Sequence, residues 1–102
     1  MPLLVDVETG PDGPPDVLAL DVGDLVAFTA PGGTVDSGTA LEPMGAFVRA
    51  LPGPDGRPLV PQGPPNLVLF RATSPGEAVV RITTGDVWAP EPRQATVRVT
   101  VR

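Results

Sequence analysis

The sequence has no cysteine, no histidine and no lysine, and these absences remove most catalytic options. Without cysteine the chain can form neither a disulfide bond nor a thiol nucleophile. Without cysteine and histidine an ordinary zinc site is excluded. The two serines, Ser37 and Ser74, have no histidine, lysine or tyrosine to activate them. Acidic residues on turns are mostly solvated or capping, so we predict a non-enzyme with no catalytic residues, no metal and no cofactor.

Long apolar runs are also missing. No run approaches the roughly 20 residues that a membrane helix needs, and Met1 to Asp6 lacks the basic region and long apolar stretch of a signal peptide. We therefore expect a soluble chain without membrane insertion or signal peptide, in an unknown compartment. The length of 102 residues suits a single domain over 1–102, expected to be a monomer. Arginine without lysine, beside abundant proline, glycine, alanine and valine, suggests a GC-rich bacterial genome.

The charge is negative and unevenly spread. Residues 1–48 carry eight acidic residues and no base, whereas residues 49–102 carry seven arginines and four acidic residues, which together give the net charge of −5. Binding to a nucleic-acid backbone depends on clustered positive charge, which this composition does not provide. We therefore do not expect a nucleic-acid partner.

Proline and glycine are abundant, at 15 and 12 residues, and they fall between the apolar runs rather than inside them. This is the pattern of many turns that join short strands. The tetrapeptide Gly-Pro-Asp-Gly occurs at 10–13 and again at 53–56, and both copies are predicted to be turns. Val22-Gly-Asp24 is predicted to be a tight turn between two strands. No segment shows a sustained helical period.

The clearest strands lie in the last third of the chain, at 67–72, 77–83 and 95–101, where apolar and polar residues alternate. This alternation indicates antiparallel sheet with one buried face. With weaker runs upstream, about seven short strands predict an all-β fold, a single immunoglobulin-like antiparallel β-sandwich. The predicted core consists of Val26, Phe28, Phe47, Phe70, Val80, Ile82, Val97 and Val99.

Three segments are predicted to be loops that bind a protein partner, at 31–38, 61–66 and 84–93. The third contains Trp88, the only tryptophan, followed by Pro90 and Pro92. A clearly predicted strand lies on each side of this loop. Tryptophan is enriched at interface hot spots, and prolines lower the entropy cost of binding. An alternative is that Trp88 folds back over the end of the sandwich as a lid on the core, and the sequence does not separate the two.

The strand order over roughly 17–101 resembles the chagasin-like inhibitors of papain-like cysteine peptidases. The resemblance rests on Leu18 to Val26, Phe70 to Gly76, Trp88 and Val97 to Val101. It implies an immunoglobulin-like sandwich that presents three loops to the cleft of a peptidase. Within those loops the family motifs match at Ser37, Gly38, Gly63 and Trp88, which are therefore the implied partner-binding residues, with a papain-like cysteine peptidase as the implied partner.

Two other functions remain open. The domain could be a structural or adhesive immunoglobulin-like module, a spacer repeat in a larger surface or phage-type protein. It could also be a calcium-dependent carbohydrate-binding sandwich, because Asp6, Glu8 and Asp12 place three carboxylates in one stretch. The spacing of these three residues does not match a known calcium loop, and an acidic, solvated edge explains them as well.

Overall fold

The fold is all-β. A computed structural model describes residues 1–9, 13–59, 65–84, 90 and 93–102. These residues form ten strands, at Leu4–Val7 (β1), Val17–Leu20 (β2), Leu25–Phe28 (β3), Gly32–Ser37 (β4), Leu41–Phe47 (β5), Leu51–Pro52 (β6), Pro58–Leu59 (β7), Leu67–Ala72 (β8), Gly76–Thr84 (β9) and Arg93–Val101 (β10). Among the described residues no helix is long and apolar enough to cross a membrane.

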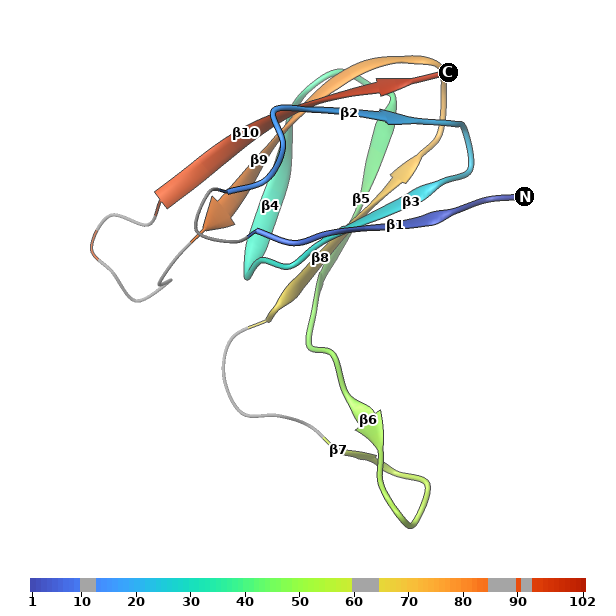
Figure 1. The fold of residues 1–102 in the computed structure, drawn as a ribbon, viewed down its shortest axis with the longest axis vertical. Coiled ribbons are helices and arrows are strands. Elements are labelled where there is room, and N and C mark those ends of the chain that lie inside the picture. Colours follow the sequence, from blue (N-terminus) through green and yellow to red (C-terminus); the bar gives the residue numbers. More distant parts are fainter. Residues whose placement is uncertain (10–12, 60–64, 85–89, 91–92) are drawn as a thin grey trace.

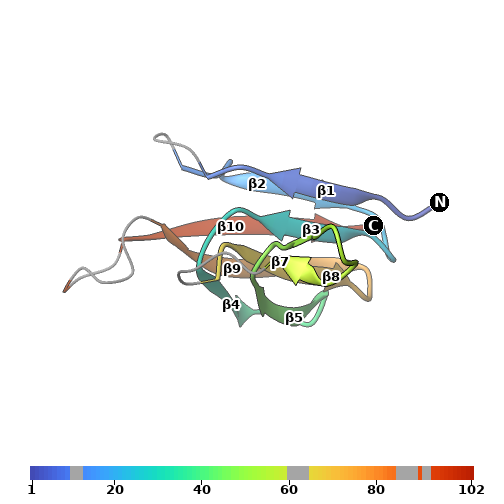
Figure 2. The same cartoon turned by 90° about the horizontal axis from the view of Figure 1, so that it is seen from below.

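Eight of these strands form two four-stranded sheets that pack face to face (Figures 1 and 2). Sheet one has the order β1-β3-β8-β5, and sheet two has the order β2-β10-β9-β4. Most neighbours are antiparallel, but β1 runs parallel to β3 and β2 runs parallel to β10. The predicted sandwich is therefore confirmed. The count exceeds the predicted seven because β6 and β7 form a separate two-stranded hairpin and because β4 lies in a segment predicted to be a loop.

The core lies between the sheets and follows the alternation read from the sequence. Seven of the eight predicted core residues are completely buried: Val26, Phe28, Phe70, Val80, Ile82, Val97 and Val99. The rings of Phe28 and Phe70 meet edge to face, with centroids 5.9 Å apart and an interplanar angle of 77°. Each such side chain stabilises the fold by about 1.5–3 kcal/mol through its removal from water.

The eighth predicted core residue, Phe47, is not in the core, because 42% of it is exposed. It pairs with Leu67, the first residue of β8, at the point where β5 leaves the sandwich. A register shift between Pro43 and Gly45 moves the second half of β5 out of phase with its first half. The alternation therefore turns Phe47 to the outer face of sheet one, since one extra residue reverses which side chains point inward.

Two further expectations are corrected by the strand pairing. The segment 31–38 was predicted to be a loop, but 32–37 is strand β4, which pairs with β9. The last three strands do not form one sheet: β9 pairs with β10, whereas β8 lies in sheet one between β3 and β5. The turn before Gly76 therefore crosses between the sheets, and Gly76 itself has a positive φ of +142°.

Candidate functional site

The connections between strands gather at two opposite ends of the sandwich. At one end, which we call the loop end, lie the β3–β4 connection at 29–31, the long β5–β8 connection at 48–66 and the β9–β10 connection. The pairing of Gly32 with Thr83, of Thr84 with Arg93 and of Phe47 with Leu67 sets this arrangement. The other end, the terminal end, carries both chain termini, as Figure 1 shows.

Hydrogen bonds fix the base of the loop end. The backbone N–H of Thr29 donates to the carbonyl of Val7 at 3.0 Å, and the hydroxyl of Thr9 donates to the carbonyl of Thr29. These bonds tie the chain after β1 to the β3–β4 connection. The β3–β4 connection therefore starts from a fixed base, which lowers the entropy cost of binding a partner there.

Asn66, the only asparagine in the chain, closes the root of the long β5–β8 connection. Its backbone N–H donates to the carbonyl of Phe47 at 3.0 Å, and its side-chain oxygen accepts from the N–H of Arg49 at 3.1 Å. Sequence reasoning missed this role. The signal was a lone asparagine directly after a proline-rich loop, since asparagine side chains often bond to nearby backbone.

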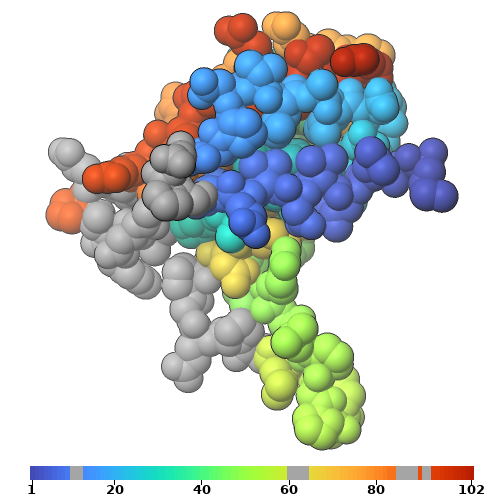
Figure 3. Space-filling model, in the orientation of Figure 1, coloured from blue at the N-terminus to red at the C-terminus, as the bar shows by residue number. Residues whose placement is uncertain are grey.

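Within the same connection, residues 51–59 form a hairpin that extends away from the body (Figures 1 and 3). We call this hairpin the arm. Its two strands pair Leu51 with Leu59, and its turn closes with the N–H of Gly56 donating to the carbonyl of Gly53 at 3.0 Å. The turn predicted at the second Gly-Pro-Asp-Gly is therefore confirmed, and Gly56 has the positive φ, +81°, that the turn needs. That this turn heads a projecting hairpin was not predicted.

The structure separates the four sequence-predicted binding residues. Gly63 and Trp88 lie outside the described residues, in connections that begin and end at the loop end. Ser37 ends β4 and Gly38 follows it, and both lie at the terminal end, because Ser37 pairs with Val79 near the start of β9. The structure therefore places Ser37 and Gly38 at the end opposite to the one where those two connections begin and end. Asp12, one of the three calcium candidates, also lies outside the described residues, and within them no group of three acidic residues is placed to hold a metal ion.

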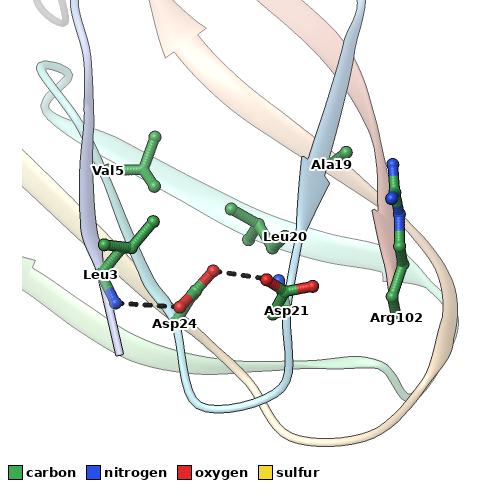
Figure 4. A pocket seen from close by; sticks show the side chains of 7 residues that line it. All are labelled: Leu3, Val5, Ala19, Leu20, Asp21, Asp24 and Arg102. Atoms are coloured by element: carbon green, nitrogen blue, oxygen red, sulfur yellow. Dashed lines mark hydrogen bonds between the residues drawn. The ribbon is translucent and has the colours of Figure 1, made fainter. Parts of the chain in front are cut away.

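At the terminal end, one buried carboxylate joins the N-terminal segment to the β2–β3 turn. Asp24 is only 4% exposed, and its two oxygens accept the backbone N–H groups of Leu3 and Asp21, each at 2.9 Å (Figure 4). The bonds from Leu3 and then Asp21 lower the pKa of the Asp24 carboxyl, while burial opposes them and the N-terminal charge adds to them. The predicted tight turn is confirmed, since the Asp24 N–H also donates to the Asp21 carbonyl at 3.0 Å.

A small pocket of about 210 Å³ lies beside this carboxylate, between β1 and β2. Figure 4 shows Leu3, Val5, Leu20 and Asp24 around it. Both oxygens of Asp24 already accept backbone donors, so this carboxylate has a structural partner on each side. We therefore assign the pocket to the contact by which Asp24 holds the N-terminal segment against the β2–β3 turn, and not to ligand binding.

We expect Asp24→Asn to lower the melting temperature by several degrees at neutral pH, because an amide offers one acceptor oxygen where two N–H groups need one each. The folded-state pKa of Asp24 lies below the ordinary value of about 3.9, so its contribution is fully present above that value. It is lost as the pH falls from about 4 through the lower, folded-state pKa. Thermal melts from pH 7 down to pH 2 check this: the gap between wild type and variant should narrow below pH 4. A constant gap would contradict it.

Comparison with known proteins gives a likeness in structure alone. No protein-family model and no curated protein matches the sequence. Among solved structures, the fold is similar to the cysteine protease inhibitor EhICP2 from Entamoeba histolytica, with a TM-score of 0.62 and 17% identity over 99% of this chain and 97% of that one. It is also similar to the solution structure of amebosin, with a TM-score of 0.56 and 19% identity over 98% of this chain and 97% of that one. The chain therefore has the chagasin-like immunoglobulin fold that the sequence resemblance predicted.

Proposed function

We propose that this chain is a non-enzymatic protein-binding domain, and that its loop end inhibits a papain-like cysteine peptidase. The observation that carries the proposal is the likeness over nearly the full chain to EhICP2, whose name describes a cysteine protease inhibitor. The bonds at Thr29 and Asn66 support it, because they would hold the β3–β4 connection and the root of the β5–β8 connection in place before a partner arrives.

Both chain termini lie at the terminal end, away from the loop end. The C-terminal Arg102 N–H donates to the carbonyl of Leu20, and Leu3 is held by Asp24. This arrangement leaves the loop end free of chain ends and open to a partner.

Within the proposed site we keep Gly63 and Trp88, because their connections start and finish at the loop end. Ser37 and Gly38 are left out, because they lie at the terminal end, opposite to the end where those connections start and finish. Trp88 is the residue on which we place most of the binding energy, since large aromatic side chains are the commonest hot spots.

The experiment is a titration of papain with the intact chain, followed by residual hydrolysis of a fluorogenic peptide. We expect tight inhibition at near-stoichiometric ratio. Trp88→Ala should weaken it about thirtyfold or more, since truncating a hot-spot residue costs about 2 kcal/mol or more. Ser37→Ala is the matched control at the other end and should inhibit like wild type. Full papain activity at micromolar concentrations of the chain would contradict the proposal for this peptidase class.

A further inference from the structure

The two outer faces of the sandwich differ in chemistry. The outer face of sheet two is polar, with threonine and arginine alternating along β10 and an ion pair of 2.8 Å between Arg81 and Asp36. The outer face of sheet one carries an apolar stripe with charged residues beside it. The stripe consists of residues that alternate with the buried ones: Leu4, Leu25, Ala27, Phe47, Leu67 and Leu69. The charged positions of the same face are Asp6, Glu42 and Arg71.

Several of these side chains are open to water. Leu4 is 60% exposed and Phe47 is 42% exposed, and the leucines between them are partly exposed. Ala27 lies in the middle of this face and is only 2% exposed, which shows that its larger neighbours already gather around it. An apolar cluster of this kind on a sheet surface marks an interaction site.

The arm stands on the same side of the molecule. Figure 1 shows the arm leaving on the side away from β2 and β10, and Figure 2, seen from that side, places it in front of β8. At the root of the arm, Nη2 of Arg49 lies 3.9 Å from Oδ1 of Asp6. Asp6 is on β1, and the strands β3 and β8 lie between β1 and β5, which leads into the arm. The root of the arm therefore leans across the outer face of sheet one.

The arm itself carries a second apolar surface. Leu51 and Leu59 pair across its two strands and are 68% and 58% exposed. A two-stranded hairpin of this length does not bury such side chains by itself and is marginally stable in water. The described part of the chain thus presents an apolar stripe and a projecting arm side by side, and both keep large apolar side chains exposed.

We propose that a second copy of this chain covers both, in a two-fold dimer in which the arm of each copy lies on the outer face of sheet one of the other. One molecule supplies both halves of the contact, which is what a two-fold interface requires. The charges suit a copy as well: Asp6 and Glu42 are balanced by Arg49 and Arg71 around this face, so the contact is neutral although the chain carries −5.

Interface size requires the arm to take part. Neighbouring strands lie about 4.8 Å apart and rise about 3.3 Å per residue. The part of sheet one in which all four strands pair therefore has a flat area of roughly 200 Å². A stable interface buries about 800 Å² on each partner. Packing face on face would therefore be too small, whereas adding both arms and their leucines enlarges it. This inference replaces the monomer expected from the sequence and does not depend on the proposed peptidase.

Sedimentation velocity over a concentration series, without any peptidase, tests the dimer. We expect wild type to associate reversibly with the mass of two chains. Leu51→Arg on the arm and Leu4→Asp on the face should each weaken association at least tenfold. Val17→Asp, at a 58% exposed position on β2 of the other sheet, is the matched control and should associate like wild type. Circular dichroism and melting temperature establish that each variant is folded.

Mixing the two variants separates arm exchange from other dimers. In the mixture, one arm and one face are both unaltered, and the arginine of the second arm meets the aspartate of the second face. Association should therefore recover to within a few fold of wild type. A wild type that stays monomeric at sub-millimolar concentration overturns the proposal. So does a Leu51→Arg variant that dimerises like wild type, or a mixture that stays monomeric.

Discussion

Phe70→Ala is expected to lower the free energy of unfolding by about 3–5 kcal/mol, the cost of emptying a packed aromatic position. Phe70 is fully buried at the centre of sheet one, pairs with Val26 on β3 and meets the ring of Phe28 edge to face. The variant loses this aromatic contact, worth about 0.5–1.5 kcal/mol, together with the burial of its ring. Because a domain of this size is stable by only about 5–15 kcal/mol, the variant should lose a large share of its stability. Equilibrium urea unfolding followed by far-UV circular dichroism measures the change.

Phe47→Ala is the matched control for that variant. Phe47 lies in the same sheet, but it is 42% exposed and lies on the outer face. Its truncation should cost about 1 kcal/mol or less, because little area is removed from the core. Both variants should be compared at concentrations too low for association. Equal losses for Phe47 and Phe70 would contradict the structure and restore the core predicted from the sequence.

The alternation of side chains predicted the sandwich and most of its core, because burial on one face of a strand leaves a period of two. In β10, Val97, Val99 and Val101 point inward and arginine and threonine point outward. The same rule failed at Phe47 because a register shift lies between Pro43 and Gly45. A shift of this kind leaves no mark in the pattern until the partner strand is known. Proline is tolerated there because β5 is an edge strand.

Strand β4 was missed for a different reason. Its start, Gly32-Gly33-Thr34, has the composition of a loop. In the structure Gly33 lies where a Cβ would come 2.8 Å from the Cδ1 of Ile82 and 3.1 Å from the carbonyl oxygen of Arg81. The glycine permits the close approach of the strand to β9, so here it signals packing and not a turn. That distinction depends on a residue about fifty positions away, which local composition does not contain.

The candidate site was predictable in part. The strands that bound the segments 61–66 and 84–93 could be predicted, although Thr84 and Arg93 are themselves strand residues, and most of both segments lies outside the described residues. The strands that pair with β8 could not be predicted, because a turn such as Ser74-Pro-Gly76 can join two strands of one sheet or two strands of different sheets. Whether a turn crosses between the sheets decides at which end each later connection lies. The short motif match at Ser37 and Gly38 therefore fell at the terminal end, whereas the connection that contains Trp88 begins and ends at the loop end.

Gly38→Ala is expected to destabilise the fold by roughly 2–5 kcal/mol, although Gly38 was first singled out as a binding residue. Its φ of +89° is a conformation that costs an alanine about 1–2 kcal/mol. An added Cβ would also collide with the carbonyl oxygen of Glu77 and lie 2.9 Å from the Cα of Ala78. Both are backbone atoms of β9 and cannot rotate away, and overpacking of this kind typically costs a further 1–3 kcal/mol. Urea unfolding at pH 7 gives the value.

Gly56→Ala separates the two causes of that loss. Gly56 has a similar φ, +81°, in the turn of the arm, but nothing lies within 4 Å of an added Cβ. It should therefore show only the backbone cost of about 1–2 kcal/mol, and less where the arm opens without the rest of the sandwich. The difference between the two variants measures the close contact of the β4–β5 corner with β9. If Gly38→Ala cost no more than Gly56→Ala, that contact would be absent, and Gly38 would again be free to serve as part of a binding surface.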